Sequence, residues 1–575
     1  MTVIGCLEIA LLAVIVGLVT RPLGGYLARV YAGQRTLLQR VLGPLENALY
    51  RLAGIKPEIE QSWLQYTISL LVFHALAIAT LYALLRLQAV LPLNPQDLAS
   101  VPPDLALNTA VSFVTNTSWQ SYGGETTLSY LSQMFGIAVH SFLSAASGMA
   151  VGIALIRGFA RRRSSTVGNF WVDVTRGTFY VLLPVCAVAA FFLMTQGVPQ
   201  TLAPAAVATT LEGGSQTIAR GPVASQEAIK LLSGDGGGFF NANSAHPFEN
   251  PTPLTNLVEL LLIFMLGAGL TNCFGRMVGS ERQGWSLLGV MAILFGLGVA
   301  GIYAAEAGGN PALASLQHFR TADTQQPHGN MEGKEVRFGI AGSALFADIS
   351  TASSDGAVNS MHDSFMPLSA GILLANMMVD EVIVGAPGSG LYGMLLFCIV
   401  AVFLAGLMIG RTPEYVGKKI GSSEVKMTIL ALTVIPLVTL GLTAVACVVE
   451  PGLAGLGNTG PHGYSEILYA YTSAAATNGS AFAGLSTNSP FYNLTLAVGM
   501  FVGRFLVIIP VLAVAGSLAE QTIIPRSNGT LPTDRVLFIG FLLGIIVILG
   551  GLTYLPVLAL GPVAEYLQLL HVTLY

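Results

Sequence analysis

Long apolar segments recur along this chain and restrict its fold more than any other feature. A helix needs about 20 residues to cross a hydrocarbon core about 30 Å thick. Eleven segments reach or approach that length: 3–20, 63–91, 128–156, 177–194, 254–274, 285–303, 358–384, 391–409, 427–449, 491–518 and 536–558. Only 10% of the 575 residues are charged, whereas soluble domains carry about 25%. We therefore predict an all-α polytopic membrane protein.

Basic residues indicate the topology, because short cytoplasmic loops of membrane proteins are enriched in Lys and Arg. Basic residues cluster in four loops, within 21–56, 157–163, 276–282 and 411–426. The first apolar segment carries Glu8 and has no basic residue before it, so we interpret it as an uncleaved helix and not as a signal peptide. With all four loops in the cytoplasm, both termini are predicted to lie outside.

The number of crossings follows from parity. The basic loops 276–282 and 411–426 are both predicted to be cytoplasmic, so an even number of crossings must join them. Three apolar segments, however, lie between these two loops. Segments 358–384 and 391–409 are separated by a stretch that contains Gly385, Gly388 and Gly390, shortly after Asp380 and Glu381. Such a break is tolerated at membrane depth only where it is buried in protein or lines a cavity. We predict one broken helix and ten crossings; a tight external turn between two ordinary helices is the alternative.

A short polar loop recurs four times between the apolar segments. The loops contain Asn116-Thr117, Asp235-Gly236, Asp355-Gly356 and Asn478-Gly479, and the separations from each first residue to the next are 119, 120 and 123 residues. Asn-Gly and Asp-Gly are common turn dipeptides, so one loop alone carries little weight. Four loops at near-equal spacing, all on the outer side of the predicted topology, indicate one unit repeated four times.

A short apolar stretch precedes each polar loop. The stretches 105–114, 226–232, 344–349 and 466–475 are too short to span a membrane but long enough for re-entrant half-helices. Asp104, Ser225, Ser343 and Ser465 are the predicted N-caps. The predicted repeat is therefore helix, pore helix, loop, helix. Its copies cover 63–163, 164–282, 283–425 with a broken second helix, and 426–526, flanked by single helices in 1–62 and 527–575.

Four such loops around one axis could form a cation filter, in which backbone carbonyls replace the water around a monovalent cation. Glycine suits this backbone because it adopts conformations that a Cβ penalises. Three loops contain Gly, but the first has none before Gly123, so the ring is predicted to be asymmetric.

These residues resemble one family, KdpA, which comprises the potassium-binding subunits of the Kdp potassium-transporting P-type ATPases. The resemblance rests on motifs that occur in order along nearly the whole chain. They are TNTSWQSY from Thr115, GGGFFNANSAHPFENPT from Gly236, EGKEVRFG from Glu332, MHDSF from Met361, GRTPEY from Gly410 and NGSAFAGL from Asn478.

The resemblance implies four helix-pore-helix repeats plus one flanking helix at each end, a fold related to potassium channels and to Trk, Ktr and HKT transporters. It also implies a complex in a bacterial inner membrane with a catalytic KdpB-like ATPase and with two single-span subunits, KdpC-like and KdpF-like. Membrane lipids are the other expected partners; no nucleic acid is expected. This chain lacks the Asp-Lys-Thr-Gly-Thr motif of P-type pumps and a phosphate-binding loop. We therefore expect it to hold no cofactor and to leave ATP and Mg²⁺ to the catalytic partner.

The resemblance also implies the potassium site. The residues that it places in the filter are Thr115, Asn116, Thr117 and Ser118, then Gly234, Asp235 and Gly236, then Ser354, Asp355 and Gly356, and finally Thr477, Asn478 and Gly479. Gln120 matches a position that tunes potassium affinity; a hydrogen-bonding amide that braces the loop is a compatible interpretation. Asp235 and Asp355 stand where neutral residues are commoner. They either accept N–H groups behind the filter or face the ion.

Arg504 lies in the middle of segment 491–518, where an uncompensated charge costs about 2.5 to 3.5 kcal/mol. It matches a family arginine below the filter, where positive charge would oppose leakage of potassium. Either Asp380 or Glu381 is its predicted partner, and these three residues with the glycine break are the predicted gate. Snorkelling of Arg504 to an interface is the alternative.

Histidines and cysteines carry no predicted chemistry. His246, His362 and His462 fall on outer loops, and their spacing does not suggest metal ligands, so hydrogen-bonded structural roles are expected. The five cysteines fall in apolar segments and are expected to be buried.

Two functions remain open from the sequence. The chain is either the ion-selecting subunit of an ATP-driven potassium importer or a self-sufficient, gradient-driven transporter of the Trk, Ktr and HKT type. The motifs at Glu332 and Gly410 and the flanking helices favour the first.

Overall fold

The computed structural model describes residues 1–311, 329–380, 382–410, 412–525 and 530–571. Within these residues, ten helices are long and apolar enough to cross a membrane. They are Val3–Tyr31, Trp63–Val90, Ser132–Ala160, Phe170–Thr195, Pro253–Met277, Glu281–Gly308, Ser389–Met408, Ser422–Ala446, Pro490–Glu520 and Val536–Leu570. The predicted fold class, an all-α polytopic membrane protein with ten crossings, is confirmed.

Short helices and connections complete the first half of the chain. Helix α1 (Val3–Tyr31) is followed by α2 (Gln39–Ala53), α3 (Trp63–Leu87), η1 (Gln88–Val90), α4 (Pro103–Val114), α5 (Gly124–Thr127), η2 (Ser132–Ala138) and α6 (Val139–Ala160). Then come α7 (Phe170–Arg176), η3 (Gly177–Leu182), α8 (Leu183–Thr195), β1 (Ala206–Thr209), β2 (Ser215–Ile218), α9 (Val223–Ser233), η4 (Asn243–Ala245) and α10 (Pro253–Met277).

The second half repeats the alternation of long and short helices. It contains α11 (Glu281–Gly308), α13 (Gly339–Ala352), η6 (His362–Ser364), α14 (Pro367–Met378), α15 (Ser389–Ile409), β3 (Glu414–Tyr415), β4 (Lys418–Lys419) and α16 (Ser422–Ala446). It ends with α17 (Glu450–Leu453), α18 (Gly460–Ala476), α19 (Pro490–Glu520), α20 (Val536–Leu558), η7 (Ala559–Val563) and α21 (Ala564–Leu570). Among the described residues, the strands form only two antiparallel pairs, β1 with β2 and β3 with β4.

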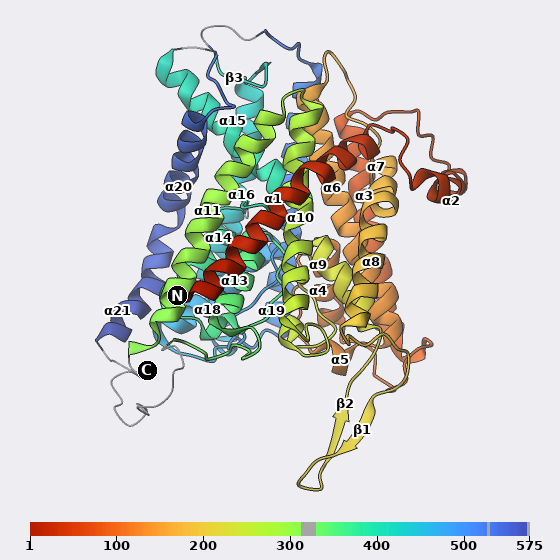
Figure 1. Ribbon diagram of the computed structural model, residues 1–575, viewed down its shortest axis with the longest axis vertical. Coiled ribbons are helices and arrows are strands. Elements are labelled where there is room, and N and C mark those ends of the chain that lie inside the picture. Colours follow the sequence, from red (N-terminus) through yellow and green to blue (C-terminus); the bar gives the residue numbers. More distant parts are fainter. Residues whose placement is uncertain (312–328, 381, 411, 526–529, 572–575) are drawn as a thin grey trace.

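Figure 1 shows how these elements are arranged. The short helices α4, α9, α13 and α18 lie inside the bundle in its lower half, and the β1–β2 hairpin extends from the lower end. The start of α1 and helix α21 lie in the same half, whereas α2 and β3 lie at the upper end. The basic loops that contain α2 and β3 are therefore in the half opposite the pore helices, which agrees with the positive-inside rule.

The broken helix occurs where parity requires it. Helix α14 has 12 residues, which is too short to span a bilayer, and the chain is not helical again until α15 begins at Ser389. The sequence predicts a continuous apolar segment over 358–384, but its first part is irregular and contains the turn η6, and α14 begins only at Pro367.

The predicted N-caps of the four pore helices are wrong. Each helix begins earlier than the apolar stretch suggests, so Asp104, Ser225, Ser343 and Ser465 lie within the helices. The residues at the cap positions make no side-chain capping bond; they are Pro102, Pro222, Phe338 and Thr459. Three of the four helices, α4, α9 and α18, have a proline at or near their start, where its missing N–H is not needed, and this signal outweighs an Asp or Ser further along; α13 has none.

The expected burial of the cysteines is only partly correct. Cys186, Cys273 and Cys398 are buried, Cys447 is half-buried and Cys6 is exposed. Cys6 lies in the first turns of α1, where most side chains face outward and would contact lipid in a membrane. An apolar segment thus places a residue in the membrane without placing it inside the protein.

Candidate functional site

All four pore helices end in the same left-handed turn. Within two residues of the end of each helix, one residue has a positive φ: 61° at Asn116, 65° at Gly234, 60° at Ser354 and 62° at Thr477. The next backbone N–H then donates back to the carbonyl five residues earlier. These bonds run from Thr117 to Ser112, from Asp235 to Lys230, from Asp355 to Ser350 and from Asn478 to Ser473, at 2.8 to 3.3 Å. This is the Schellman ending of a helix.

The shared turn corrects the register of the first loop by one residue. Thr117, and not Asn116, is the structural equivalent of Asp235, Asp355 and Asn478, because it makes the equivalent backbone bond. The sequence suggested Asn116 because only its side chain resembles those of the other three residues. In this loop the polar side chain has moved to the left-handed position, which Asn tolerates better than most residues.

Two residues after the first positive φ, three of the loops return to a positive φ. The values are 58° at Ser118, 83° at Gly356 and 105° at Gly479, whereas Gly236 keeps a negative φ. Alternation of this kind turns neighbouring carbonyls of a loop toward the same side, as a cation site made of carbonyls requires.

The four loops form a closed ring in sequence order. The first contacts the second, since Asn116 Nδ2 donates to the Gly234 carbonyl at 2.6 Å. A Cβ on Gly236 would overlap the backbone of Gly356, which joins the second loop to the third. Ser354 Oγ donates to the Thr477 carbonyl at 3.0 Å in the fourth loop. The ring closes where a Cβ on Gly479 would overlap the Thr117 carbonyl oxygen in the first.

The residues in the middle of the loops are held by neighbours within the protein. Asp235 Oδ1 accepts a hydrogen bond of 2.5 Å from Ser118 Oγ, and Asp355 Oδ1 accepts one of 3.0 Å from the Ala357 N–H. Asn478 Nδ2 donates to the Ser350 carbonyl at 2.9 Å. Asp355 Oδ2 is buried with no hydrogen-bond partner among the described residues. The two acids thus differ, because only Asp355 has an oxygen free.

Gln120 braces the second loop. Its Nε2 donates to the Gly238 carbonyl at 3.2 Å, and its Oε1 accepts from the Gly238 N–H at 3.2 Å. A side-chain amide and a backbone peptide therefore form a closed pair of hydrogen bonds between the first and second loops.

A buried charge network, which the sequence does not predict, lies behind the second loop. Lys230 Nζ lies 2.8 Å from Glu227 Oε2 and 2.8 Å from Glu249 Oε2, and all three side chains are at most 1% exposed. Lys230 also donates to Asn243 Oδ1 at 2.7 Å, and Asn243 Nδ2 donates to the Gly236 carbonyl. A lysine three residues after a glutamate on a pore helix was the available signal, since such residues are neighbours on a helix.

The break between α14 and α15 lies directly beneath the ring. A Cβ on Gly234 would lie 2.9 Å from Ala386 Cβ and 3.0 Å from Pro387 Cδ. Gly385 and Gly388 have positive φ values of 56° and 105°. A Cβ on Gly390 would overlap the backbone of Gly385, so the break folds back on itself.

Arg504 lies next to the break and beneath the fourth loop. It is 3% exposed, and its Nη2 donates to the Ser144 carbonyl at 3.5 Å, while its Nε has no partner among the described residues. Arg504, Asp380 and Thr477 line one cavity. Arg504 makes no ion pair with Asp380 or any other described acid, and Glu381 lies outside the described residues. The structure thus shows no ion pair between Arg504 and Asp380, one of its two predicted partners, although both side chains border the same cavity.

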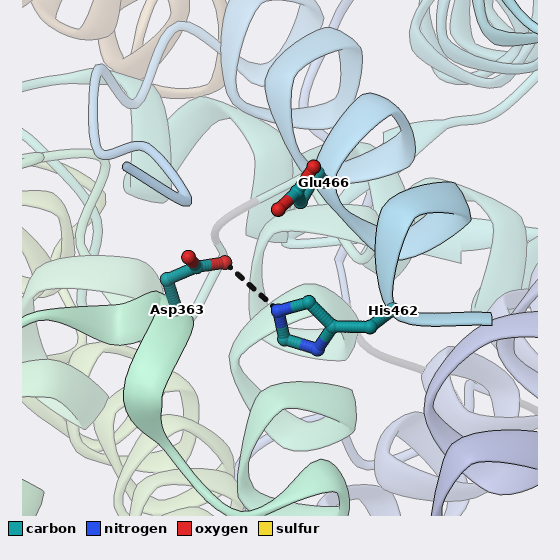
Figure 2. Close-up of side chains that lie close together, drawn as sticks. All are labelled: Asp363, His462 and Glu466. Atoms are coloured by element: carbon teal, nitrogen blue, oxygen red, sulfur yellow. Dashed lines mark hydrogen bonds and ion pairs between the residues drawn. The ribbon is translucent and has the colours of Figure 1, made fainter. Parts of the chain in front are cut away.

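The outer loops bring together residues that lie far apart in the sequence. His462 interacts with Asp363 and with Glu565, and Glu466 lies beside them (Figure 2). The spacing between the histidines alone does not indicate this cluster. The cluster contains one histidine and several acids. Its local signal was the spacing of four residues from His462 to Glu466, which places both on one face of a helix.

In the described part of the chain, ten apolar helices surround a ring of four re-entrant loops, which is the arrangement of a membrane transport protein with a channel-like fold. The same fold occurs in the potassium transporter TrkH from Vibrio parahaemolyticus, with a TM-score of 0.52 at 13% identity, over 85% of this chain and 97% of that one. The chain belongs to the family of the potassium-transporting ATPase A subunit, KdpA, whose family model matches residues 10–567.

Curated relatives match the chain along its whole length. It is 60% identical over 575 residues, all of both chains, to a protein of Granulibacter bethesdensis. It is 62% identical to one of Methylobacterium radiotolerans, over 99% of this chain and 98% of that one. Both proteins are named potassium-transporting ATPase potassium-binding subunit.

Proposed function

We propose that this chain is the potassium-binding and translocating subunit of an ATP-driven potassium importer. The observation that carries the proposal is the closed ring of four loops, each entered through the same left-handed turn. Membership of the potassium-transporting ATPase family and the names of the 60% identical relatives support the choice of ion and of energy source.

In this proposal the carbonyls of 115–118, 234–236, 354–356 and 477–479 bind the dehydrated ion. Gln120 sets the affinity through the position of the second loop, since it pairs with the peptide of Gly238. Arg504, Asp380 and the break at Gly385, Gly388 and Gly390 lie next on the path, beneath the ring. A buried positive charge there repels a cation that has passed the filter.

ATP hydrolysis is assigned to a partner, because the chain has neither a P-type phosphorylation motif nor a phosphate-binding loop. We propose that the partners are a catalytic P-type ATPase and two single-span subunits, in a bacterial inner membrane. The basic loops at one end of the bundle support a topology with the filter and both termini outside.

Reconstitution tests the proposal against a self-sufficient transporter. The chain is placed in liposomes alone and together with its ATPase partner, and potassium flux and potassium-stimulated ATP hydrolysis are measured. We expect low flux from the chain alone and ATP-dependent uptake from the complex. Substantial flux from the chain alone would assign it to the gradient-driven class.

A further inference from the structure

Three metal-ligating side chains from distant parts of the chain meet beside the outer end of α18. Asp363 belongs to the turn η6, His462 to the first turn of α18, and Glu466 follows one helical turn later. Their nearest donor atoms all lie within 4.8 Å of one another. Figure 2 shows Asp363 beside His462, joined to its Nε2 by the dashed line, and Glu466 above the ring on the next turn of the helix.

The spacing fits a small divalent ion. Zn²⁺ lies about 2.0 to 2.2 Å from nitrogen and oxygen ligands, so tetrahedral ligand atoms lie roughly 3.3 Å apart. His462 Nε2 and Asp363 Oδ1 are 3.1 Å apart. Glu466 is fully buried and needs only a small side-chain shift to complete a set of three donors.

The other nitrogen of His462 already has a partner. Nδ1 lies 2.9 Å from Glu565 Oε1, and a carboxylate on the second nitrogen is the usual arrangement around a metal-bound histidine. If Nδ1 carries the proton, the lone pair of Nε2 faces an oxygen of Asp363. Two such acceptors approach to 3.1 Å only when a positive species, a metal ion or a second proton, lies between them.

Each carboxylate is also held from behind. Asp363 Oδ2 accepts from the Gly484 N–H at 3.0 Å, and Glu466 Oε1 accepts from Asn458 Nδ2 at 2.8 Å. A Cβ on Gly484 would crowd oxygens of both carboxylates, so this glycine lets the two acids converge. Outer partners of this kind orient metal ligands.

The charge of the cluster favours a divalent cation over a proton. Three carboxylates surround one imidazole, and no described lysine or arginine forms an ion pair with any of the three. One added proton leaves two negative charges uncompensated, whereas a divalent ion with a neutral imidazole leaves one.

We propose that Asp363, His462 and Glu466 bind a divalent transition-metal ion, with Zn²⁺ the best match to one imidazole and two carboxylates. Glu565 orients the imidazole, and a water molecule completes the coordination. The ion holds together η6, α18 and α21, and through Gly484 it contacts the segment that follows the fourth filter loop. This proposal is independent of the ion that the filter carries.

Cobalt binding to the purified full chain tests the site, because Co²⁺ replaces Zn²⁺ and reports its geometry by visible absorption. We expect one Co²⁺ per chain, with the intense bands of four- or five-coordination that Zn²⁺ abolishes. His462→Gln and Glu466→Gln should lose these bands while they keep the wild-type gel-filtration profile. His246→Gln, which alters an outer-loop histidine outside the cluster, should keep them.

Two results would overturn the proposal. The first is wild-type protein that takes up no Co²⁺ or Zn²⁺ at micromolar concentration, which would mean that a proton bridges the cluster. The second is equal uptake by wild type and by both cluster variants, which would mean that the ion binds elsewhere.

Discussion

At the scale of single residues, the second filter loop is fixed from two directions. Gln120 holds the Gly238 peptide from the first loop, and the Lys230 network holds the Gly236 carbonyl through Asn243. The first support is a neutral pair of hydrogen bonds, whereas the second is a buried charge cluster. Substitution of Gln120 should therefore mainly change potassium affinity, and substitution of Lys230 should mainly change stability.

Gln120→Arg should weaken the apparent potassium affinity of the complex by about tenfold or more, which corresponds to about 1.4 kcal/mol. Arginine cannot accept a hydrogen bond from the Gly238 N–H, and it adds positive charge near the filter. The half-saturating potassium concentration for ATP hydrolysis measures the effect. Gln216→Arg, on the exposed strand β2, is the control. An unchanged affinity in Gln120→Arg would remove this residue from the site.

Lys230→Met should destabilise the protein by about 3 to 5 kcal/mol, because it leaves buried carboxylates without their cation. The apparent melting temperature in detergent, followed by gel filtration, measures the loss. A triple variant that also carries Glu227→Gln and Glu249→Gln should recover much of it, since the two carboxylates that pair with Lys230 are then neutral as well. If the triple variant melts as low as the single one, the role of Lys230 is packing and not charge.

At the scale of elements, the sequence predicts helices well where composition decides and poorly where tertiary contacts decide. The last span is predicted at 536–558, and α20 has these bounds because its residues are uniformly apolar, although the helix continues through η7 and α21 to Leu570. The first span is predicted to stop at Thr20, but α1 continues to Tyr31. Arg21 and Arg29 mark where the apolar part ends, but they do not end the helix, which can continue beyond the bilayer. The amphipathic helix α2 falls in a segment interpreted only as a basic loop.

The candidate site divides in the same way. Its four loops are predictable because they repeat in the sequence. The register of the first loop, the separation of Arg504 from Asp380, and the clusters around Lys230 and His462 are not. Each of these depends on which distant segments become neighbours, and local patterns carry no information on that point.

The break between α14 and α15 should tolerate no side chain at Gly388. Its φ of 105° is unfavourable for other residues, which costs about 1 to 3 kcal/mol, and a Cβ there would also overlap the Gly148 carbonyl of α6. Gly388→Ala should therefore lower the apparent melting temperature more than Gly410→Ala, which has a positive φ but open space around its Cβ. An equal decrease in melting temperature for both variants would mean that α6 can move to accommodate the added methyl group, and that the break is packed less tightly than the structure indicates.

At the scale of the whole molecule, we propose that the ring and the charge beneath it act in series on the transported cation. The cavity below the ring contains Arg504, which no described acid neutralises by an ion pair. In a low-dielectric interior such a charge raises the energy of a cation that moves straight through. We therefore expect a fold shared with TrkH to conduct little in this chain when it stands alone.

Arg504→Gln should therefore convert the chain into a leak. In liposomes that contain the chain alone, rubidium uptake down its gradient should be low for wild type and should rise at least about tenfold in the variant. A barrier lowered by about 1.4 kcal/mol already has that effect. Arg504→Lys keeps the positive charge and should keep the flux low, which distinguishes charge from shape. If Arg504→Gln conducts no more than wild type, the charge of Arg504 is not the barrier, and the block lies elsewhere on the path, with the glycine break as the next candidate.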